Sequence, residues 1–157
     1  MPIAVIVDWY GPYTSKAALR DEMCCWASGT RALYMGVRRG NIVNYVGLTN
    51  RPESRMNNHE KLAHPDNVKF FCGEIVTRGI GWRRATVCKT DLKLAEHALI
   101  AYLKPAQNST LSRRDLDDCV VLYSRFFDAR DGETPSNPLP KFPCVIAYNS
   151  WSGDWDV

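Results

Sequence analysis

Two short runs of apolar and β-branched residues around one polar turn constrain the fold of this chain more than any other feature. The runs are Ala32–Val37 and Ile42–Leu48, and the turn between them reads Arg-Arg-Gly-Asn. Extended runs on either side of a glycine-containing turn predict an antiparallel β-hairpin. We therefore expect a β-sheet that includes this hairpin.

The hairpin carries one tyrosine on each strand. If Arg39 and Gly40 form a two-residue turn, Tyr34 stands directly opposite Tyr45 on one face of the sheet. A turn at Gly40 and Asn41 would change the register and separate the two phenols. Taken alone, such a pair more often serves packing than chemistry.

The patterns outside the hairpin predict alternating helices and strands. Hydrophobic periodicity, capping residues and glycine or proline breaks place the elements. They are a strand at Ile3–Asp8, a helix from Thr14 or Ser15 to about Trp26, a helix from Pro52 to about Leu62, a strand at Val68–Thr77, a helix at Asp91–Leu103 capped by Thr90, and a last strand at Val145–Tyr148. Leu116–Phe127 fits either a strand or a helix, and the ending Trp151–Trp155 is turn-like. The order predicts an α+β domain whose small antiparallel or mixed sheet is flanked by helices.

Length and composition suit a single domain covering 1–157. The chain has 157 residues, of which 45% are hydrophobic, so it can bury a core without disulfides. Its six cysteines include no Cys-x-x-Cys pair, and the adjacent Cys24 and Cys25 are poorly placed to bind one tetrahedral zinc. We expect most of the cysteines to be free and buried as small apolar residues.

Apolar segments are short throughout. The run Ile3–Val7 is too short for the hydrophobic region of a signal peptide, and no basic segment precedes it. No stretch approaches the about 20 apolar residues that a membrane-spanning helix needs. We therefore expect a soluble cytoplasmic protein without a membrane partner.

Basic residues gather in the central part of the chain, although the formal net charge is only +3. Acidic residues are more frequent after Asp115. Charge alone fits an ordinary solvated surface, but a basic central region also suits contact with a phosphate backbone. The candidate nucleic-acid contacts are Arg38, Arg39, Arg51, Arg78, Arg83 and Arg84, the last three in a loop around Trp82.

One carboxylate falls where a helix should be apolar. Leu92, Leu99, Ile100 and Leu103 form one stripe of the predicted helix, and Glu96 lies inside that stripe. A buried carboxylate is costly unless it is paired or bound to a metal. Two interpretations remain, an ion pair with an arginine or a ligand for Mg²⁺, and we favour the second slightly.

The arginine available for such a pair is Arg55. It lies four residues before His59, so the two side chains share one face of the helix predicted after Pro52. An arginine there can hold a phosphate oxygen pair, and a histidine can move a proton near neutral pH. For these two residues alone, an exposed amphipathic helix is the better explanation.

Three separated blocks of this sequence resemble the GIY-YIG nuclease superfamily. Ala32-Leu33-Tyr34, followed after ten residues by Tyr45-Val46-Gly47, resembles the family signature. Leu48-Thr49 followed by Arg55 and His59 resembles the family's arginine–histidine helix, and Ala95–Ile100 followed by Lys104-Pro105 and Asn108 is similar to its glutamate helix and the asparagine after it. The resemblance covers about residues 30–110 and leaves extensions at 1–29 and 111–157.

One position departs from the family pattern. Ala32 stands where the first motif has glycine, and Gly29 opens a second alignment that would put Arg31 at the position of the tyrosine. We prefer Tyr34, because its spacing to Tyr45 fits the signature and a hairpin can pair the two.

The resemblance implies a metal-dependent endonuclease that hydrolyses phosphodiester bonds in DNA with a single Mg²⁺ or Mn²⁺. Glu96 would hold the metal, Arg55 would bind the scissile phosphate, and Tyr34 would take a proton from the attacking water. Tyr45 and His59 would position water or relay the proton. Supporting roles fall to Gly47, Thr49 and Asn108.

Other functions stay open at this point. They are a non-catalytic nucleic-acid-binding module on the same scaffold, a nuclease toxin with the same core, and a zinc-stabilised interaction protein. The expected partner is DNA, double- or single-stranded, and the sequence does not separate DNA from RNA. A homodimer is plausible, because a small single-site nuclease needs two protomers or two events to cut both strands.

Overall fold

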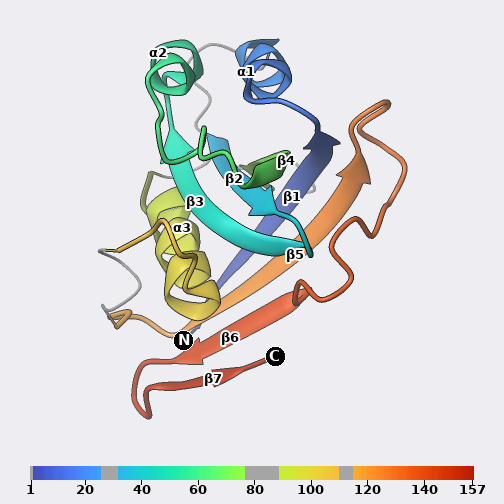
Figure 1. The fold of residues 1–157 in the computed structure, drawn as a ribbon. Coiled ribbons are helices and arrows are strands. Elements are labelled where there is room, and N and C mark those ends of the chain that lie inside the picture. The colour runs from blue at the N-terminus through green and yellow to red at the C-terminus, as the bar shows by residue number, and fades with distance from the viewer. Residues whose placement is uncertain (1, 26–31, 77–88, 110–114) are drawn as a thin grey trace.

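The computed structural model describes residues 2–25, 32–76, 89–109 and 115–157, and these form a curled seven-stranded sheet with three helices (Figure 1). In chain order the elements are β1 (Ile3–Tyr13), α1 (Lys16–Cys25), β2 (Ala32–Arg38), β3 (Ile42–Thr49), α2 (Pro52–Asn57), β4 (Asn67–Ile75), α3 (Lys89–Leu103), β5 (Val120–Asp128), β6 (Val145–Asn149) and β7 (Asp154–Asp156). The predicted order of the first seven elements is confirmed. Leu116–Phe127, which fitted either state, contributes to a strand.

The sheet has the strand order β3-β2-β4-β1-β5-β6-β7. Its neighbours pair antiparallel except β1 and β5, which run parallel. The mixed sheet is therefore confirmed, but it is larger than predicted, because segments before residue 30 and after residue 110 supply β1, β5, β6 and β7. Asp8 of β1 accepts two hydrogen bonds from its register partner Arg125 of β5, at 2.6 and 2.8 Å.

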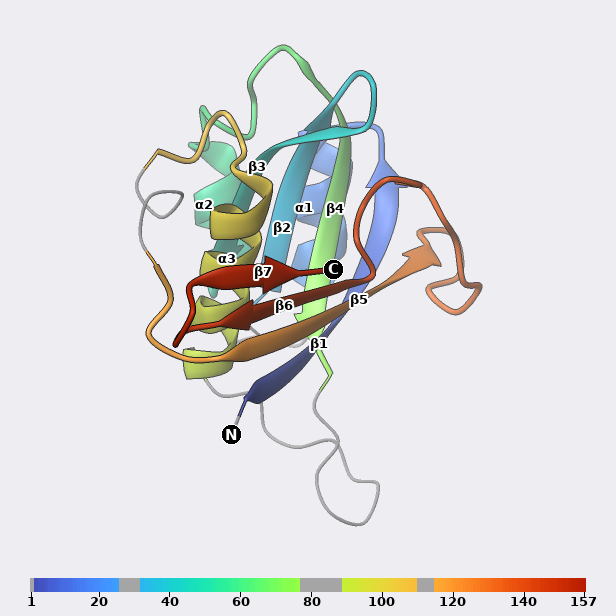
Figure 2. The ribbon, with the colours of Figure 1, turned by 90° about the horizontal axis from the view of Figure 1, so that it is seen from below.

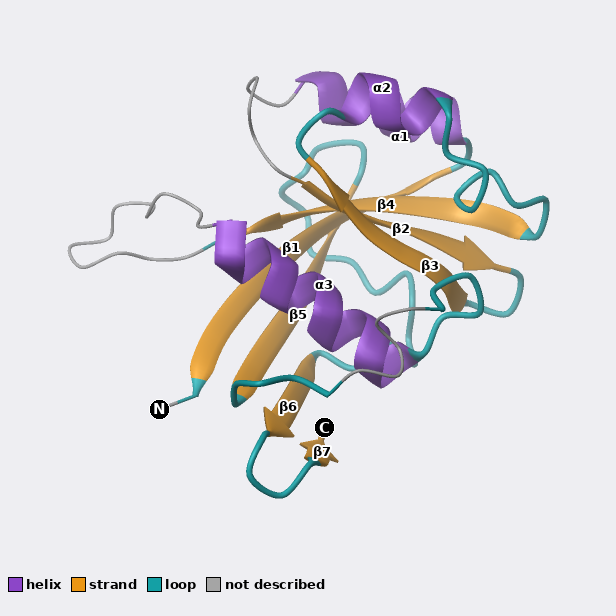
Figure 3. Ribbon diagram, turned by 90° about the vertical axis from the view of Figure 1, so that its left-hand side faces the viewer, coloured by secondary structure: helices purple, strands orange, loops and turns teal. Residues whose placement is uncertain are grey.

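Helices cover both faces of the sheet, with α1 and α2 on one side and α3 on the other (Figure 3). Leu19 of α1 and Met56 of α2 pack with Tyr34 and Phe70 in one buried cluster. Leu92 and other apolar residues of α3 pack in the second cluster with the opposite face of the strands. Beyond β1 the sheet continues through β5, β6 and β7, which lie side by side near the C-terminus (Figure 2).

The predicted register of the hairpin is wrong. Tyr34 pairs with Gly47, and Tyr45 pairs with Gly36. A three-residue turn, with Arg38 paired to Ile42, moves the register by one position, and an irregularity after Gly36 moves it by one more. The two tyrosines are therefore diagonal neighbours on one face rather than directly opposite. Gly36 lies where a Cβ would meet the side-chain nitrogen of Asn67 at 2.7 Å, so a contact distant in sequence accompanies the shift.

The second helix is shorter than predicted. It ends at Asn57 instead of continuing to about Leu62, so His59 lies in the turn that follows it. Two consecutive asparagines, Asn57 and Asn58, favour turns over helix. The ring of His59 stabilises the new turn, because its Nδ1 accepts the backbone N–H of Leu62 at 3.2 Å.

One predicted helix cap is confirmed and another is wrong. Ser15 caps α1 through its hydroxyl, which accepts the N–H of Ala18 at 3.1 Å, as predicted. By contrast α3 begins at Lys89, so Thr90 lies inside the helix and is not its cap.

The ending after Trp151 is also more regular than predicted. Asp154–Asp156 forms β7, and Trp155 pairs with Tyr148 of β6. The prediction of mostly buried cysteines is wrong as well. The described cysteines are free, but Cys24, Cys25 and Cys144 are exposed and only Cys72 is fully buried.

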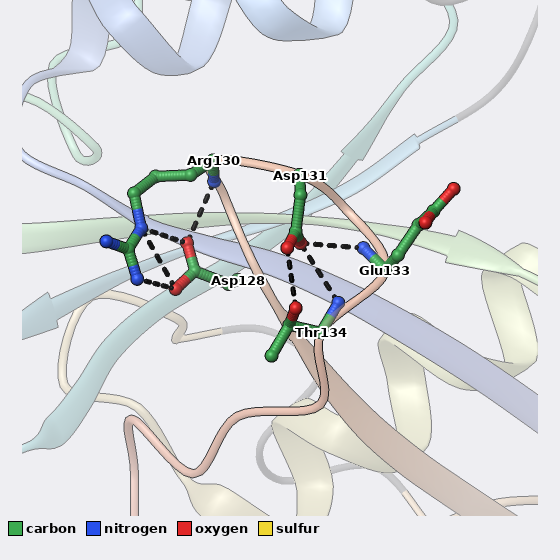
Figure 4. A network of polar contacts seen from close by, with 5 residues as sticks. All are labelled: Asp128, Arg130, Asp131, Glu133 and Thr134. Carbon is green, nitrogen blue, oxygen red and sulfur yellow. Dashed lines mark hydrogen bonds and ion pairs between the residues drawn. The ribbon is translucent and has the colours of Figure 1, made fainter.

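The loop after β5 is held by its own side chains (Figure 4). Asp131 accepts the backbone N–H groups of Glu133 and Thr134, both at 2.9 Å, and Arg130 forms an ion pair with Asp128 at 2.7 Å. Within the described residues no helix is long and apolar enough to cross a membrane.

Candidate functional site

Tyr34 is the most deeply buried member of the predicted site. Its side chain is 0% exposed, and its hydroxyl accepts a hydrogen bond from Nε of Arg55 at 3.3 Å. Burial, followed by the neighbouring Tyr45, raises the pKa of Tyr34 above its ordinary value of 10.0, and the Arg55 guanidinium opposes this only in part. The phenol is therefore protonated at neutral pH.

Two further predicted residues surround this phenol. The ring centroids of Tyr34 and Tyr45 lie 6.0 Å apart, and the His59 ring lies edge-on to both, at 5.5 and 4.8 Å. Tyr34, Tyr45, Arg55 and His59 thus form one cluster on the face covered by α1 and α2. They meet although His59 is not on the same helix as Arg55.

His59 is neutral in this cluster. Its pKa is lowered from 6.5 to about 4, first by burial and then by the positive charges of Arg55, Lys16 and Lys61. Because Nδ1 accepts the Leu62 N–H, the proton of the neutral ring is on Nε2. That N–H is buried and has no hydrogen-bond partner among the described residues, so it can donate to a water or ligand only where the packing around it opens.

Gly47 makes room for Tyr34. A Cβ at this position would lie 2.6 Å from both Cζ and the hydroxyl oxygen of Tyr34. The tyrosine ring therefore lies across the backbone of the facing strand, which only a residue without a side chain permits.

The outer edge of β3 is occupied by the segment after α3. The Asn108 side chain accepts the N–H of Val46 at 2.9 Å and donates to the carbonyl of the same residue at 2.8 Å. The backbone N–H of Gln107 donates to the carbonyl of Asn44 at 3.0 Å. Asn108 thus acts as a strand partner for the residue between Tyr45 and Gly47.

Glu96 reaches the same edge from α3. It is half-buried, and burial raises its pKa from 4.5 to about 7, while a hydrogen bond from the backbone of Leu48 and the charges of Arg55 and Lys93 lower it. Residues 46 and 48 of a strand direct their backbone groups to the same side. Glu96 and Asn108 therefore lie next to each other along the edge of β3.

Arg55 acts electrostatically on residues from both faces of the sheet. It is exposed on α2, and its guanidinium acts on the pKa of Tyr34 and on that of Glu96. The positive charge of Arg55 therefore acts on both the phenol cluster and the Glu96 carboxylate, which approach β3 from opposite sides.

Thr49 shapes the start of α2. It is buried, and its hydroxyl accepts the backbone N–H of Arg51 at 2.9 Å. This turn leads the chain from β3 into the helix that carries Arg55. Pro52 and Glu53 occupy the first turn of that helix, as the sequence predicted.

The carboxylate of Glu96 is the candidate ligand for a divalent cation. Among the described residues no three His, Cys, Asp or Glu side chains gather as a metal-binding group. Mg²⁺ at phosphoryl-transfer sites needs fewer protein ligands, because one or two carboxylates, waters and substrate oxygens suffice. A single half-buried carboxylate with a raised pKa fits such a cation.

The predicted basic contacts that the structure describes lie in two places. Arg38 and Arg39 are exposed at the hairpin end, and Arg51 is exposed at the start of α2. Arg78, Arg83 and Arg84, and the alternative position Arg31, lie outside the described residues. Sequence reasoning missed Lys16, whose charge acts on His59 from α1; no local signal connects it to the site.

A search of protein-family models, curated proteins and solved structures found no match to this chain.

Proposed function

We propose that this protein is an endonuclease that hydrolyses phosphodiester bonds in DNA with one divalent cation, Mg²⁺ or Mn²⁺. The observation that carries the proposal is the convergence of Tyr34, Tyr45, Arg55 and His59, with Nε of Arg55 at 3.3 Å from the Tyr34 hydroxyl and Glu96 within reach of the same charge. The proposal includes a GIY-YIG-like arrangement of the core at residues 30–110.

Glu96 is the residue that would hold the cation. When bound there, the cation neutralises charge on the phosphate and on the leaving oxygen. A carboxyl with a pKa of about 7 is only partly ionised near neutral pH, so a cation competes with its proton. Affinity for the cation should therefore rise with pH through this range.

Arg55 is the phosphate ligand. Its guanidinium has no ion-pair partner in the described part of the chain, and its Nε is directed at Tyr34. The remaining N–H groups of the guanidinium can form a forked contact with a phosphate. Because Tyr34 is completely buried, its hydroxyl reaches a substrate only if Arg55 moves toward the phosphate and uncovers it.

Tyr34 and His59 act on the attacking water in different ways. Tyr34 is protonated, so its oxygen accepts a proton from the water only as its own proton passes on through the neighbouring Tyr45 phenol toward solvent. His59 cannot accept a proton, because Nδ1 is engaged and Nε2 is protonated; it orients the water as a donor. The water oxygen bonds to phosphorus as the bond to the leaving oxygen breaks.

Cleavage of labelled single- and double-stranded DNA tests this function. We expect cutting with Mg²⁺, no cutting with EDTA, and loss of cutting in Glu96→Ala. The control is Glu133→Ala, which removes an exposed carboxylate in the loop after β5, where Glu133 contacts Asp131 through its backbone N–H, and which should still cut. Binding without cutting would favour a nucleic-acid-binding module over a nuclease. Cutting by the Glu96→Ala variant would show that Glu96 is not the metal ligand. An RNA substrate run in parallel decides between the two nucleic acids.

A further inference from the structure

A surface pocket of about 520 Å³ lies at the turn end of the β2–β3 hairpin. It is lined by Arg38, Arg39, Ile42, Pro65, Asp66 and Val68. The first three residues come from the hairpin and the others from the segment that enters β4. The pocket is therefore built on the two strands that also carry Tyr34 and Tyr45.

The charge of this pocket is positive. Neither Arg38 nor Arg39 has an ion-pair partner among the residues that the structure describes. Asp66 adds one carboxylate to the two guanidiniums, so the pocket keeps a net positive charge. Lys69 adds a positive charge beside the turn, where its Nζ donates to the side chain of Asn41 at 2.8 Å. Two guanidiniums are thus left with their hydrogen-bonding groups open to a ligand.

The same pocket has an apolar part. Ile42 is 48% exposed and Val68 is 37% exposed, and they belong to the few large hydrophobic residues at the described surface that are open to this degree. Aliphatic surface beside unpaired guanidiniums suits a ligand that combines a phosphate with a flat apolar ring.

We propose that this pocket binds one nucleotide of the substrate strand beyond the cleavage position. Arg38 and Arg39 hold the phosphodiester, and Ile42 and Val68 contact the base or sugar. The inference rests on the proposed nuclease function and adds the path of the substrate to it. Charge complementarity selects a nucleic acid, because the two guanidiniums of the pocket outnumber its one carboxylate, Asp66.

The pocket contributes affinity rather than chemistry. Arg38 lies four residues along β2 from Tyr34, which corresponds to about 13 Å of strand. At roughly 3.4 Å per nucleotide of a duplex strand, this distance is about four nucleotides. A substrate should therefore extend at least that far from the scissile bond on one side.

Binding of fluorescein-labelled oligonucleotides to the non-cleaving Glu96→Gln protein in EDTA tests the pocket, with anisotropy measured over a range of salt concentrations. We expect the added changes Arg38→Gln and Arg39→Gln to weaken binding by roughly tenfold. The slope of log K against log salt should fall by about 0.7 to 0.9, because the two guanidiniums together hold one phosphodiester. Ile42→Ser with Val68→Ser should weaken binding and leave the slope unchanged. The matched control is Arg130→Gln, which removes an exposed arginine that is paired with Asp128.

The outcomes separate the pocket from the nuclease function. If the wild-type protein cuts DNA but the Arg38 and Arg39 changes alter neither affinity nor slope, the pocket is excluded and the function stands. If binding depends on the pocket but nothing is cut, the pocket stands and the nuclease function fails. If the enzyme cuts, substrates shortened on one side of the scissile bond or on the other should be compared. KM should rise for one side only, when fewer than about four nucleotides remain there. An equal rise of KM for both sides overturns the proposed path.

Discussion

Gly47 lies directly across the β2–β3 pair from Tyr34, and a Cβ on this glycine would lie 2.6 Å from the Cζ and the hydroxyl oxygen of the tyrosine. The ring of Tyr34 thus occupies the space that a side chain on the facing strand would take. In the sequence the glycine appears only as part of a motif. In the structure it decides where the phenol lies.

Gly47→Ala should lower the free energy of unfolding by about 1–3 kcal/mol, because the added methyl group overpacks the tyrosine ring. Chemical denaturation of the single and double variants measures this. In a Tyr34→Leu background, which removes the atoms of the clash, the same change should cost much less. An equal cost in both backgrounds would show that Tyr34 is not the cause.

Glu96 should make the protein less stable as pH rises. Its pKa is about 7 in the folded chain against 4.5 ordinarily, so the folded state holds more protons than the unfolded state between these values. Stability from this group is therefore present below about pH 4.5 and lost as pH rises through about 7. In EDTA, Glu96→Gln should raise Tm at pH 8 and change it little at pH 5. Glu53→Gln, which alters an exposed carboxyl of α2, should show no such difference between the two pH values.

His59 should make the protein more stable as pH rises, opposite to Glu96. Its pKa is lowered from 6.5 to about 4, so stability is present above pH 6.5 and lost as pH falls through 4. His59→Asn keeps an acceptor for the Leu62 N–H and should flatten this loss, measured by denaturant unfolding at several pH values. His64→Asn is the control, because His64 is not among the buried residues. The pH ranges in which His59 and Glu96 change stability overlap, and the two effects have opposite signs. The stability of the wild-type protein should therefore vary little with pH there, and each variant should reveal the pH dependence of the remaining group.

Asn108 should be sensitive to a change of a single atom. Asn108→Asp keeps the acceptor for the Val46 N–H. It also replaces the amide nitrogen of Asn108, which lies 2.8 Å from the Val46 carbonyl, by an oxygen that repels this carbonyl. We expect a loss of about 1–3 kcal/mol that grows as the new carboxyl ionises. Gln107→Ala should cost little, because Gln107 contacts Asn44 through its backbone. Equal effects of the two changes in thermal unfolding would contradict the strand-partner role.

The sequence predicted what depends on local pattern. Strands β2, β3 and β4 follow from runs of apolar residues, and α3 follows from its periodic stripe with Glu96 inside it. It also predicted Thr14 or Ser15 as the cap of α1, of which Ser15 is the one observed. It predicted the gathering of Tyr34, Tyr45, Arg55 and His59 too, although through a wrong register and a helix that is too long.

The remainder depends on contacts between distant segments. The shift after Gly36 coincides with the approach of Asn67 from another strand, which no local spacing reveals. The strand β7 is three residues long and is polar on both sides of Trp155, so it is defined by pairing with β6 and not by its own pattern. Likewise the influence of Lys16 on His59 arises only because α1 packs beside α2.

The parallel pairing of β1 with β5 has a consequence for synthesis of the chain. Asp8 and Arg125 are 117 positions apart, so one side of β1 has no strand partner until residues 120–128 have left the ribosome. Contacts this distant in sequence form late and slow the folding of a domain. A nascent chain or a truncated product that stops before β5 would expose an open hydrophobic strand edge in the middle of the future sheet. Such an edge invites pairing with other chains, so incomplete products of this protein should aggregate and depend on chaperones.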